Sequence, residues 1–149
     1  MSKAFDKVNH SILFIKLMQK RIPVNIIKLL VTWYANSVSV VNWYGIISKS
    51  YTLRAGVRQG GVLSPNFFSI YVDGVISAID GSNLGCKIGT QNMGILMYAD
   101  DLVLISASVC KLQTMISICV DALHNLDLKV NLKKIHLHEN WHTIQICVC

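Results

Sequence analysis

The stretch that decides the fold is Gly94-Ile95-Leu96-Met97-Tyr98-Ala99-Asp100-Asp101-Leu102-Val103-Leu104-Ile105. Two adjacent carboxylates, Asp100 and Asp101, separate two apolar runs. Each run is short and bounded, which is typical of a buried strand. The pattern therefore predicts a β-hairpin with the acidic pair at its tight turn.

The acidic pair also predicts a cation site. Neighbouring negative charges repel each other and are costly to remove from water. A divalent cation offsets that cost, and Mg²⁺ prefers carboxylate oxygen as its ligand. This is the arrangement that a two-metal phosphoryl-transfer site requires. A solvated turn is the alternative interpretation, because Asp is common in turns.

The composition is that of one globular domain or part of one. The chain has 149 residues, 52% hydrophobic and 15% charged, whereas disorder requires few apolar residues and much charge. No run reaches the ~18 apolar residues of a membrane span, and the first residues make a poor signal peptide. We therefore expect an intracellular protein, in the nucleus or cytoplasm, with no membrane partner. The odd number of cysteines and the lack of a Cys-x-x-Cys pair predict reduced thiols.

The charge is unevenly distributed along the chain. Residues 1–60 carry nine Lys and Arg against one Asp, which gives +8. Residues 61–128 carry two Lys against six Asp, which gives −4, and residues 129–149 carry three Lys against one Glu, which gives +2. A basic half beside an acidic centre fits a polyanion held over a metal site. An ordinary solvated surface is the alternative.

The spacing of apolar residues and the positions of Gly, Pro and Ser predict the remaining helices and strands. Helices are expected over residues 9–21 and 23–35, a hairpin over 38–53 turning near Gly45, and a flexible loop over 56–61. Ser64 is expected as the N-cap and Pro65 as the first residue of a helix that ends at Gly81. Further on, the pattern predicts strands over 84–88 and 128–132 and a helix capped by Ser106 or Ser108. Antiparallel strands interrupted by helices indicate an α+β domain with helices on one sheet face.

Four blocks of this sequence, in order, resemble the motifs of one enzyme family. They are residues 2–6 (Ser-Lys-Ala-Phe-Asp), 58–65 (Arg-Gln-Gly-Gly-Val-Leu-Ser-Pro), 97–102 (Met-Tyr-Ala-Asp-Asp-Leu) and 126–134 (Leu-Asp-Leu-Lys-Val-Asn-Leu-Lys-Lys). The chain thereby resembles the reverse transcriptase domain of LINE-type, non-LTR retrotransposons. The match covers residues 2 to about 135.

The resemblance implies an RNA-directed DNA polymerase with a polymerase palm, which is an antiparallel sheet with helices packed on one face, plus part of the fingers. Residues 1–149 would form a partial reverse transcriptase domain. Within it, about 8–60 would be the fingers-like part, 1–7 and 61–135 the palm, and 136–149 a diverged tail. The partners implied are an RNA template, a DNA primer and deoxynucleoside triphosphates.

The resemblance also assigns catalytic residues. Asp100 and Asp101 would ligate Mg²⁺ or Mn²⁺, Asp101 as the weaker or second ligand. Lys134 matches the fourth motif's lysine loosely and would neutralise or protonate the leaving pyrophosphate. For Lys134, a place in a solvated basic cluster remains the alternative.

Five further residues would contact nucleotide, primer or template. Phe5 would close on the sugar 2′ position and favour deoxynucleotides, and Tyr98 would support the primer terminus. Arg58, Gln59 and Gly60 would line the incoming nucleotide and template, because glycine lets backbone approach a ligand and Gln offers both a donor and an acceptor. The alternatives are a core aromatic for Phe5, a surface charge for Arg58 and a flexible turn at Gly60.

One departure from the family pattern lowers the expected activity. The family's first motif opens with a metal-binding Asp five residues before the aromatic, and that position precedes Met1. Asp6 lies on the other side of Phe5 and does not replace it. The rest of the fingers, the primer-gripping segment and the thumb also lack a counterpart, so another chain is a candidate supplier. We therefore expect a truncated copy with little or no polymerase activity of its own.

Three rival interpretations of the function stay open. The rivals are a catalytically dead nucleic-acid-binding remnant of a retrotransposon, an RNA-dependent RNA polymerase, and a misfolded product with no role. Ala99 and Phe5 argue against the RNA polymerase, since those enzymes favour glycine before the acidic pair and lack a bulky residue at the sugar gate.

The tail also contains residues that could bind zinc, although their His-x-His and Cys-x-Cys spacing matches no familiar zinc finger, and a diverged end is the favoured interpretation. These residues are His136, His138, His142, Cys147 and Cys149.

Overall fold

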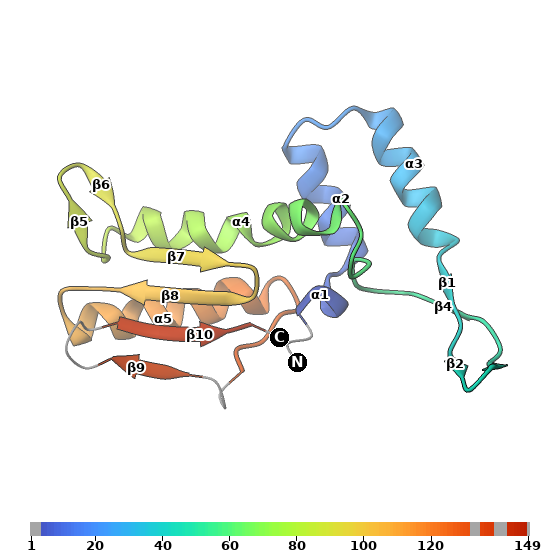
Figure 1. Cartoon of the computed structure of the whole chain (residues 1–149). Helices are drawn as coiled ribbons and strands as arrows, with labels where there is room; N and C mark the ends of the chain where they lie inside the picture. The colour runs from blue at the N-terminus through green and yellow to red at the C-terminus, as the bar shows by residue number, and fades with distance from the viewer. Residues whose placement is uncertain (1–3, 132–134, 139–142, 149) are drawn as a thin grey trace.

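The computed structural model describes residues 4–131, 135–138 and 143–148 and combines helices with antiparallel strands (Figure 1). The predicted α+β class is confirmed at this level. Among the described residues, no helix is both long and apolar enough to cross a membrane.

The largest sheet contains the acidic hairpin. Its strands are β7 (Ile95–Tyr98), β8 (Asp101–Ile105), β9 (His136–His138) and β10 (Thr143–Cys147). They lie in the order β7-β8-β10-β9, and every neighbouring pair is antiparallel. Leu102 and Leu104 are fully buried, whereas Val103 and Ile105 are only half-buried. This alternation gives the sheet one apolar face.

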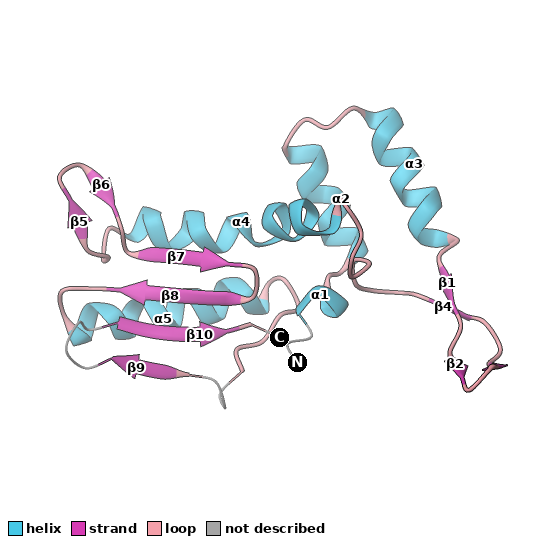
Figure 2. Ribbon diagram, viewed as in Figure 1, coloured by secondary structure: helices cyan, strands magenta, loops and turns pink. Residues whose placement is uncertain are grey.

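Two long helices cover that face (Figure 2). They are α4 (Ser64–Ser82) and α5 (Val109–His124), and they pack against each other. Apolar side chains recur at helical spacing along the buried stripe of each helix. The buried stripes are Phe68, Tyr71, Val75 and Ile79 in α4, and Leu112, Met115, Cys119 and Leu123 in α5.

The N-terminal part forms three helices: α1 (Ala4–Lys7), α2 (His10–Gln19) and α3 (Val24–Ala35). Asn9 caps α2, since its Oδ1 accepts hydrogen bonds from the N–H groups of Ser11 and Ile12 at 3.0 and 3.4 Å. The second predicted helix begins one residue after Pro23, which occupies its N-cap. Helix α2 packs against both α3 and α4.

A narrow arm follows α3 and extends away from the sheet (Figure 1). It pairs β1 (Val38–Ser39) with β4 (Tyr51–Thr52) and β2 (Asn42–Trp43) with β3 (Ile46–Ile47). The chain reverses at Tyr44 and Gly45, both at positive φ, which agrees with the turn predicted near Gly45. A second small hairpin, β5 (Lys87–Ile88) with β6 (Gln91–Asn92), precedes the acidic one.

The termini of α4 differ from the prediction. The helix begins at Ser64 itself, with Leu63 at the N-cap, and the Ser64 hydroxyl donates to the Arg58 carbonyl at 2.5 Å. The hydroxyl is therefore used to hold the preceding loop and does not cap the helix. The helix also continues through Gly81 and ends at Ser82, and its C-cap Asn83 has a left-handed φ of 55°. Asn tolerates that conformation and can replace glycine at a helix end.

The strands near the C-terminus also differ. The predicted strand over 128–132 is an isolated bridge between Val130 and Val148 as far as the described residues go, and the strand over 84–88 shrinks to β5. No strand is predicted after residue 135, yet β9 and β10 lie there, and β10 occupies the interior of the sheet beside β8. The sheet partner of the acidic hairpin therefore comes from the segment interpreted as a diverged tail.

Candidate active site at the acidic hairpin

The β7–β8 hairpin forms as predicted. Tyr98 pairs with Asp101, which leaves Ala99 and Asp100 as a two-residue turn. Ala99 has φ of 51°, at a position that tight hairpins usually give to glycine or another residue tolerant of positive φ. The acidic pair is therefore divided: Asp100 lies in the turn, whereas Asp101 is the first residue of β8.

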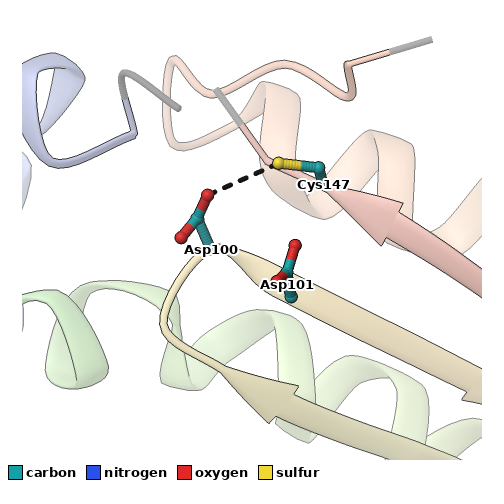
Figure 3. Close-up of side chains that lie close together, drawn as sticks. All are labelled: Asp100, Asp101 and Cys147. Atoms are coloured by element: carbon teal, nitrogen blue, oxygen red, sulfur yellow. Dashed lines mark hydrogen bonds between the residues drawn. The ribbon is translucent and has the colours of Figure 1, made fainter. Parts of the chain in front are cut away.

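A cysteine lies against this acidic pair. One carboxylate oxygen of Asp100, one of Asp101 and the Sγ of Cys147 all lie within 4.8 Å of one another (Figure 3). The Cys147 thiol donates to Oδ2 of Asp100 at 3.4 Å. Asp101 is exposed and Asp100 is half-buried, whereas Cys147 at the end of β10 is 2% exposed. The three side chains thus form one cluster with the carboxylates on its open side.

A cleft of about 550 Å³ lies between the hairpin and the first half of α4, and we call it the hairpin cleft. Its lining includes Tyr98 and Ala99 from the hairpin and Phe5 from α1. The Phe5 ring stacks on Phe68 of α4, with centroids 4.5 Å apart and planes at 18°. Phe5 is therefore supported from behind and half-buried, with the cleft in front of it.

A second cleft of about 830 Å³, which we call the arm cleft, lies between α3, the base of the arm and the loop over 56–61. Arg58 and Gln59 contribute to its lining, together with Asp6. The Gln59 amide donates to Oδ1 of Asp6 at 2.9 Å. Tyr34 closes another side of this cleft, and burial raises its pKa, which keeps its hydroxyl neutral.

Backbone hydrogen bonds fix the loop over 56–61 to the N-terminal segment. The Gly56 N–H donates to the carbonyl of Val8, and the Val57 N–H donates to the carbonyl of Phe5, each at 2.8 Å. Gly56 has φ of 92°, and a Cβ built there would lie 2.9 Å from the Cα of Asp6. Only glycine suits this approach. The loop that carries Gln59 is therefore held next to the segment that carries Phe5.

These contacts divide most of the residues expected at the site between the two clefts. Phe5 and Tyr98 share the hairpin cleft, and Arg58 and Gln59 share the arm cleft. Gly60 is exposed at φ of 78° and lines neither cleft. Lys134 lies outside the described residues.

Sequence reasoning missed two residues of the site. Cys147 appeared only as a zinc candidate of the tail, and within the described part of the chain it groups with the two aspartates instead of with histidines; His142 and Cys149 lie outside that part. The alternation of polar and apolar residues over Thr143-Ile144-Gln145-Ile146 was the available signal for a strand there. Asp6 was considered only as a replacement metal ligand, and its bond to Gln59 has no sequence signature.

Comparisons with known proteins give the family. The family described as "Reverse transcriptase (RNA-dependent DNA polymerase)" matches residues 1–145. The chain is 29% identical over 134 residues to the Retrovirus-related Pol polyprotein from type-2 retrotransposable element R2DM of Drosophila melanogaster, and 30% identical over 136 residues to that from type-1 element R2 of Nasonia vitripennis. A third such polyprotein, from the R2 element of Popillia japonica, is 26% identical over 134 residues.

These matches cover 89–91% of this chain but only 13–19% of the length of the relatives. The chain thus corresponds to one short part of a much longer polyprotein, and the resemblance stated on four sequence blocks is confirmed. Because the family match extends over nearly all of its residues, this chain belongs to the reverse transcriptase (RNA-dependent DNA polymerase) family.

Proposed function

We propose that this chain forms the central part of an RNA-directed DNA polymerase that uses an RNA template, a DNA primer and deoxynucleoside triphosphates. The observation that carries the proposal is the position of the hairpin: its turn residue Ala99 lines the hairpin cleft together with Phe5, and the two aspartates follow Ala99 directly in the chain. At about 550 Å³ the cleft is within the usual size of small-molecule sites. The names of the relatives, Pol polyproteins of retrotransposable elements, support the same class.

In this proposal the four-stranded sheet with α4 and α5 belongs to the palm, which takes residues 1–7 and 61–135. Helices α2 and α3 and the arm belong to the fingers-like part, about residues 8–60. The pairing of β9 and β10 with β8 supports counting their residues with the palm sheet as well.

Asp100 and Asp101 are the proposed ligands of divalent cations, Mg²⁺ or Mn²⁺ as the family resemblance implies. Carboxylate oxygens are donors that such ions prefer, and the open side of the cluster lets an ion enter. Divalent ions bound there would stabilise the charge on the attacking primer 3′ oxygen and on the leaving pyrophosphate. Asp100 lies in the turn and Asp101 is the first residue of β8, so the backbone keeps the two carboxylates next to each other.

The remaining residues are proposed to position substrates. Phe5, braced by Phe68, would contact the sugar at C2′ and exclude a hydroxyl, and the 86% exposed Tyr98 would support the primer terminus. Arg58 and Gln59 would contact the nucleotide and the template from the arm cleft. Gly60 would let the template backbone approach. Lys134 would neutralise or protonate the leaving pyrophosphate.

The whole enzyme would need parts that lie outside the matched stretch, supplied by the same polyprotein or by another chain. We place it inside the cell, in the nucleus or cytoplasm, because that is where RNA templates and deoxynucleotides occur.

The proposal is tested by binding of a labelled deoxynucleoside triphosphate and of an RNA–DNA primer–template, each with and without Mn²⁺. Asp100→Asn should abolish the metal-dependent part of nucleotide binding, because it removes a ligand charge. The matched control is Asp121→Asn, an exposed acid on α5 that should bind as the wild type does. Equal metal dependence in all three proteins would overturn the proposal. In primer extension, we expect little or no synthesis by the chain alone.

A second candidate function is metal-independent binding of nucleic acid. It is favoured by the arm, where Trp43 and Tyr44 are 71% and 93% exposed within a segment of charge +8. Exposed aromatics and cations together bind single strands by stacking and phosphate contacts. The same assay separates the two functions: primer–template binding that survives Asp100→Asn and ignores Mn²⁺ supports the second.

A further inference from the structure

The cluster at the hairpin turn contains a sulfur donor that a magnesium site does not need. Its atoms come from three places: the turn (Asp100), the start of β8 (Asp101) and the end of β10 (Cys147) (Figure 3). We propose that these three side chains form one metal site with two oxygen donors and one sulfur donor, and that it selects a thiophilic divalent ion such as Zn²⁺ over Mg²⁺. The inference rests on the proposed role of the two aspartates as metal ligands. It departs from that proposal in the ion, because the thiol does not suit the Mg²⁺ that the family resemblance implies.

The backbone holds the three donors together. Cys147 lies directly opposite Asp101 in the β8–β10 register, and the Val148 N–H donates to the Asp100 carbonyl at 2.8 Å. Opposite residues of antiparallel strands have Cβ atoms about 4.5–5.5 Å apart. The backbone pairing therefore keeps Cys147 beside Asp101 and holds the turn that carries Asp100 next to the end of β10.

The donor distances suit one shared ion. Around a tetrahedral Zn²⁺, a thiolate at about 2.3 Å and a carboxylate oxygen at about 2.1 Å are about 3.6 Å apart. The Sγ of Cys147 and Oδ2 of Asp100 are 3.4 Å apart, and the third donor lies within 4.8 Å of both. Small rotations of the exposed Asp101 side chain would complete a three-ligand site. Three protein ligands leave one position open for water or a substrate oxygen.

The chemistry of the donors decides the ion. Thiolate favours Zn²⁺ and other soft or borderline ions, whereas Mg²⁺ takes oxygen ligands in a near-octahedral shell and keeps several waters. The thiol is almost fully buried at the floor of the cluster, so an ion held by both carboxylates lies against sulfur on its inner side. As the metal–sulfur bond forms, the thiol proton, which Cys147 shares with Asp100 in the free protein, passes to the buffer.

The competing interpretation treats Cys147 as a buried strand residue with a weak hydrogen bond. Free cysteine is often buried and behaves as a small hydrophobic side chain. The two interpretations differ in one observable, which is whether a metal ion bound by the aspartates is also bonded to sulfur.

The test is a titration of the reduced 149-residue chain with Co²⁺, followed by the thiolate-to-cobalt charge-transfer absorption in the near ultraviolet, and then competition by Zn²⁺ and by Mg²⁺. We expect one equivalent of Co²⁺ to produce the band, Zn²⁺ to displace it, and millimolar Mg²⁺ to leave it unchanged. Cys147→Ser should remove the band and weaken Zn²⁺ binding, measured by calorimetry, by about tenfold or more. Cys110→Ser, at an exposed cysteine of α5, is the matched control and should retain both.

Asp101→Asn supplies a second variant, because an exposed side chain can change without disturbing the core. It should weaken Co²⁺ binding and alter the band, which ties carboxylate and thiol to one ion even if Cys147→Ser folds poorly. A wild-type protein without the band, or a band that persists in folded Cys147→Ser, would overturn the inference. If Mn²⁺ still binds in an Asp100-dependent way in that case, the proposed function survives. If no ion responds to Asp100→Asn, both fail.

Discussion

Gln59 donates a side-chain hydrogen bond to Asp6 at 2.9 Å, although 53 residues separate them in the chain. The bond lies where the loop over 56–61 meets α1, at the edge of the arm cleft. It turns the amide nitrogen of Gln59 toward the protein and leaves the amide oxygen as the group that can face a ligand. Asp6 therefore acts on the proposed nucleotide site through Gln59, without being a metal ligand.

We predict that Asp6→Ala weakens deoxynucleotide binding about threefold to tenfold, which corresponds to about 0.7–1.4 kcal/mol. The reason is that Gln59 loses the partner that orients it. Stability should change by less than about 1 kcal/mol, because an exposed hydrogen bond contributes little net free energy. Asp6→Asn retains an oxygen that accepts from Gln59, so it should bind nucleotide nearly as the wild type does. Equal loss in both variants would show that charge, and not orientation, matters.

The second prediction concerns Gly56, whose left-handed φ and close approach to Asp6 both depend on the missing side chain. Gly56→Ala should lower the free energy of unfolding by more than about 1 kcal/mol, the cost that an alanine usually meets at positive φ. Gly45→Ala is the matched control, because Gly45 has φ of 85° with nothing within 4 Å of a built Cβ. Urea denaturation of both variants separates the cost of positive φ from the cost of the close approach to Asp6. Equal losses in the free energy of unfolding would contradict a clash at Gly56.

Several features of this fold are local and could be predicted. Two short apolar runs on either side of Asp100 and Asp101 predicted the acidic hairpin. The Ser64-Pro65 start predicted α4, and apolar residues at helical spacing predicted α5. The exact ends were less predictable, because Ser64 has two possible uses for its hydroxyl, and a tertiary contact with the Arg58 carbonyl decides between them.

The parts of the site that escaped prediction depend on contacts between distant segments. Cys147 meets Asp101 only because β10 inserts between β8 and β9, and nothing in the local pattern of the tail states that register. The Asp6–Gln59 bond likewise depends on the backbone hydrogen bonds that join Gly56 and Val57 to the N-terminal segment. The two aspartates could be predicted from the sequence, whereas the position of Cys147 beside them could be seen only once the pairing of β8 with β10 was known.

The third prediction concerns Tyr71, whose hydroxyl joins three segments. It donates to the Leu126 carbonyl at 2.5 Å and accepts from the Asn9 N–H at 3.1 Å. Tyr71→Phe leaves both backbone groups without this partner, and a buried unsatisfied group costs about 1–3 kcal/mol. We expect a loss of that size in the free energy of unfolding, measured in urea. Tyr44→Phe, at a side chain that is 93% exposed, should leave it unchanged. A Tyr71→Phe variant as stable as wild type would mean that water replaces the hydroxyl.

The last prediction concerns Cys119, which is fully buried in α5. Burial raises the pKa of its thiol from 9.0 to about 11. A rise of that size reduces the thiolate fraction at pH 8 about a hundredfold relative to an ordinary thiol, and thiolate is the reactive form. In pulsed alkylation with peptide mass analysis, the exposed Cys110 should therefore react, whereas Cys119 should stay unmodified until urea unfolds the chain.

The same shift has a consequence for stability. The folded chain keeps the Cys119 proton more tightly than the unfolded chain does, so the stabilising contribution is complete below pH 9 and is lost as pH rises through about 11. The free energy of unfolding should therefore fall across this range, and burial raises the pKa of Tyr71 in the same direction. Cys119→Ala should lower stability at neutral pH through the lost packing, and it should also make the alkaline decline shallower. An unchanged slope would show that Cys119 contributes nothing to the decline and that other groups, Tyr71 among them, account for it.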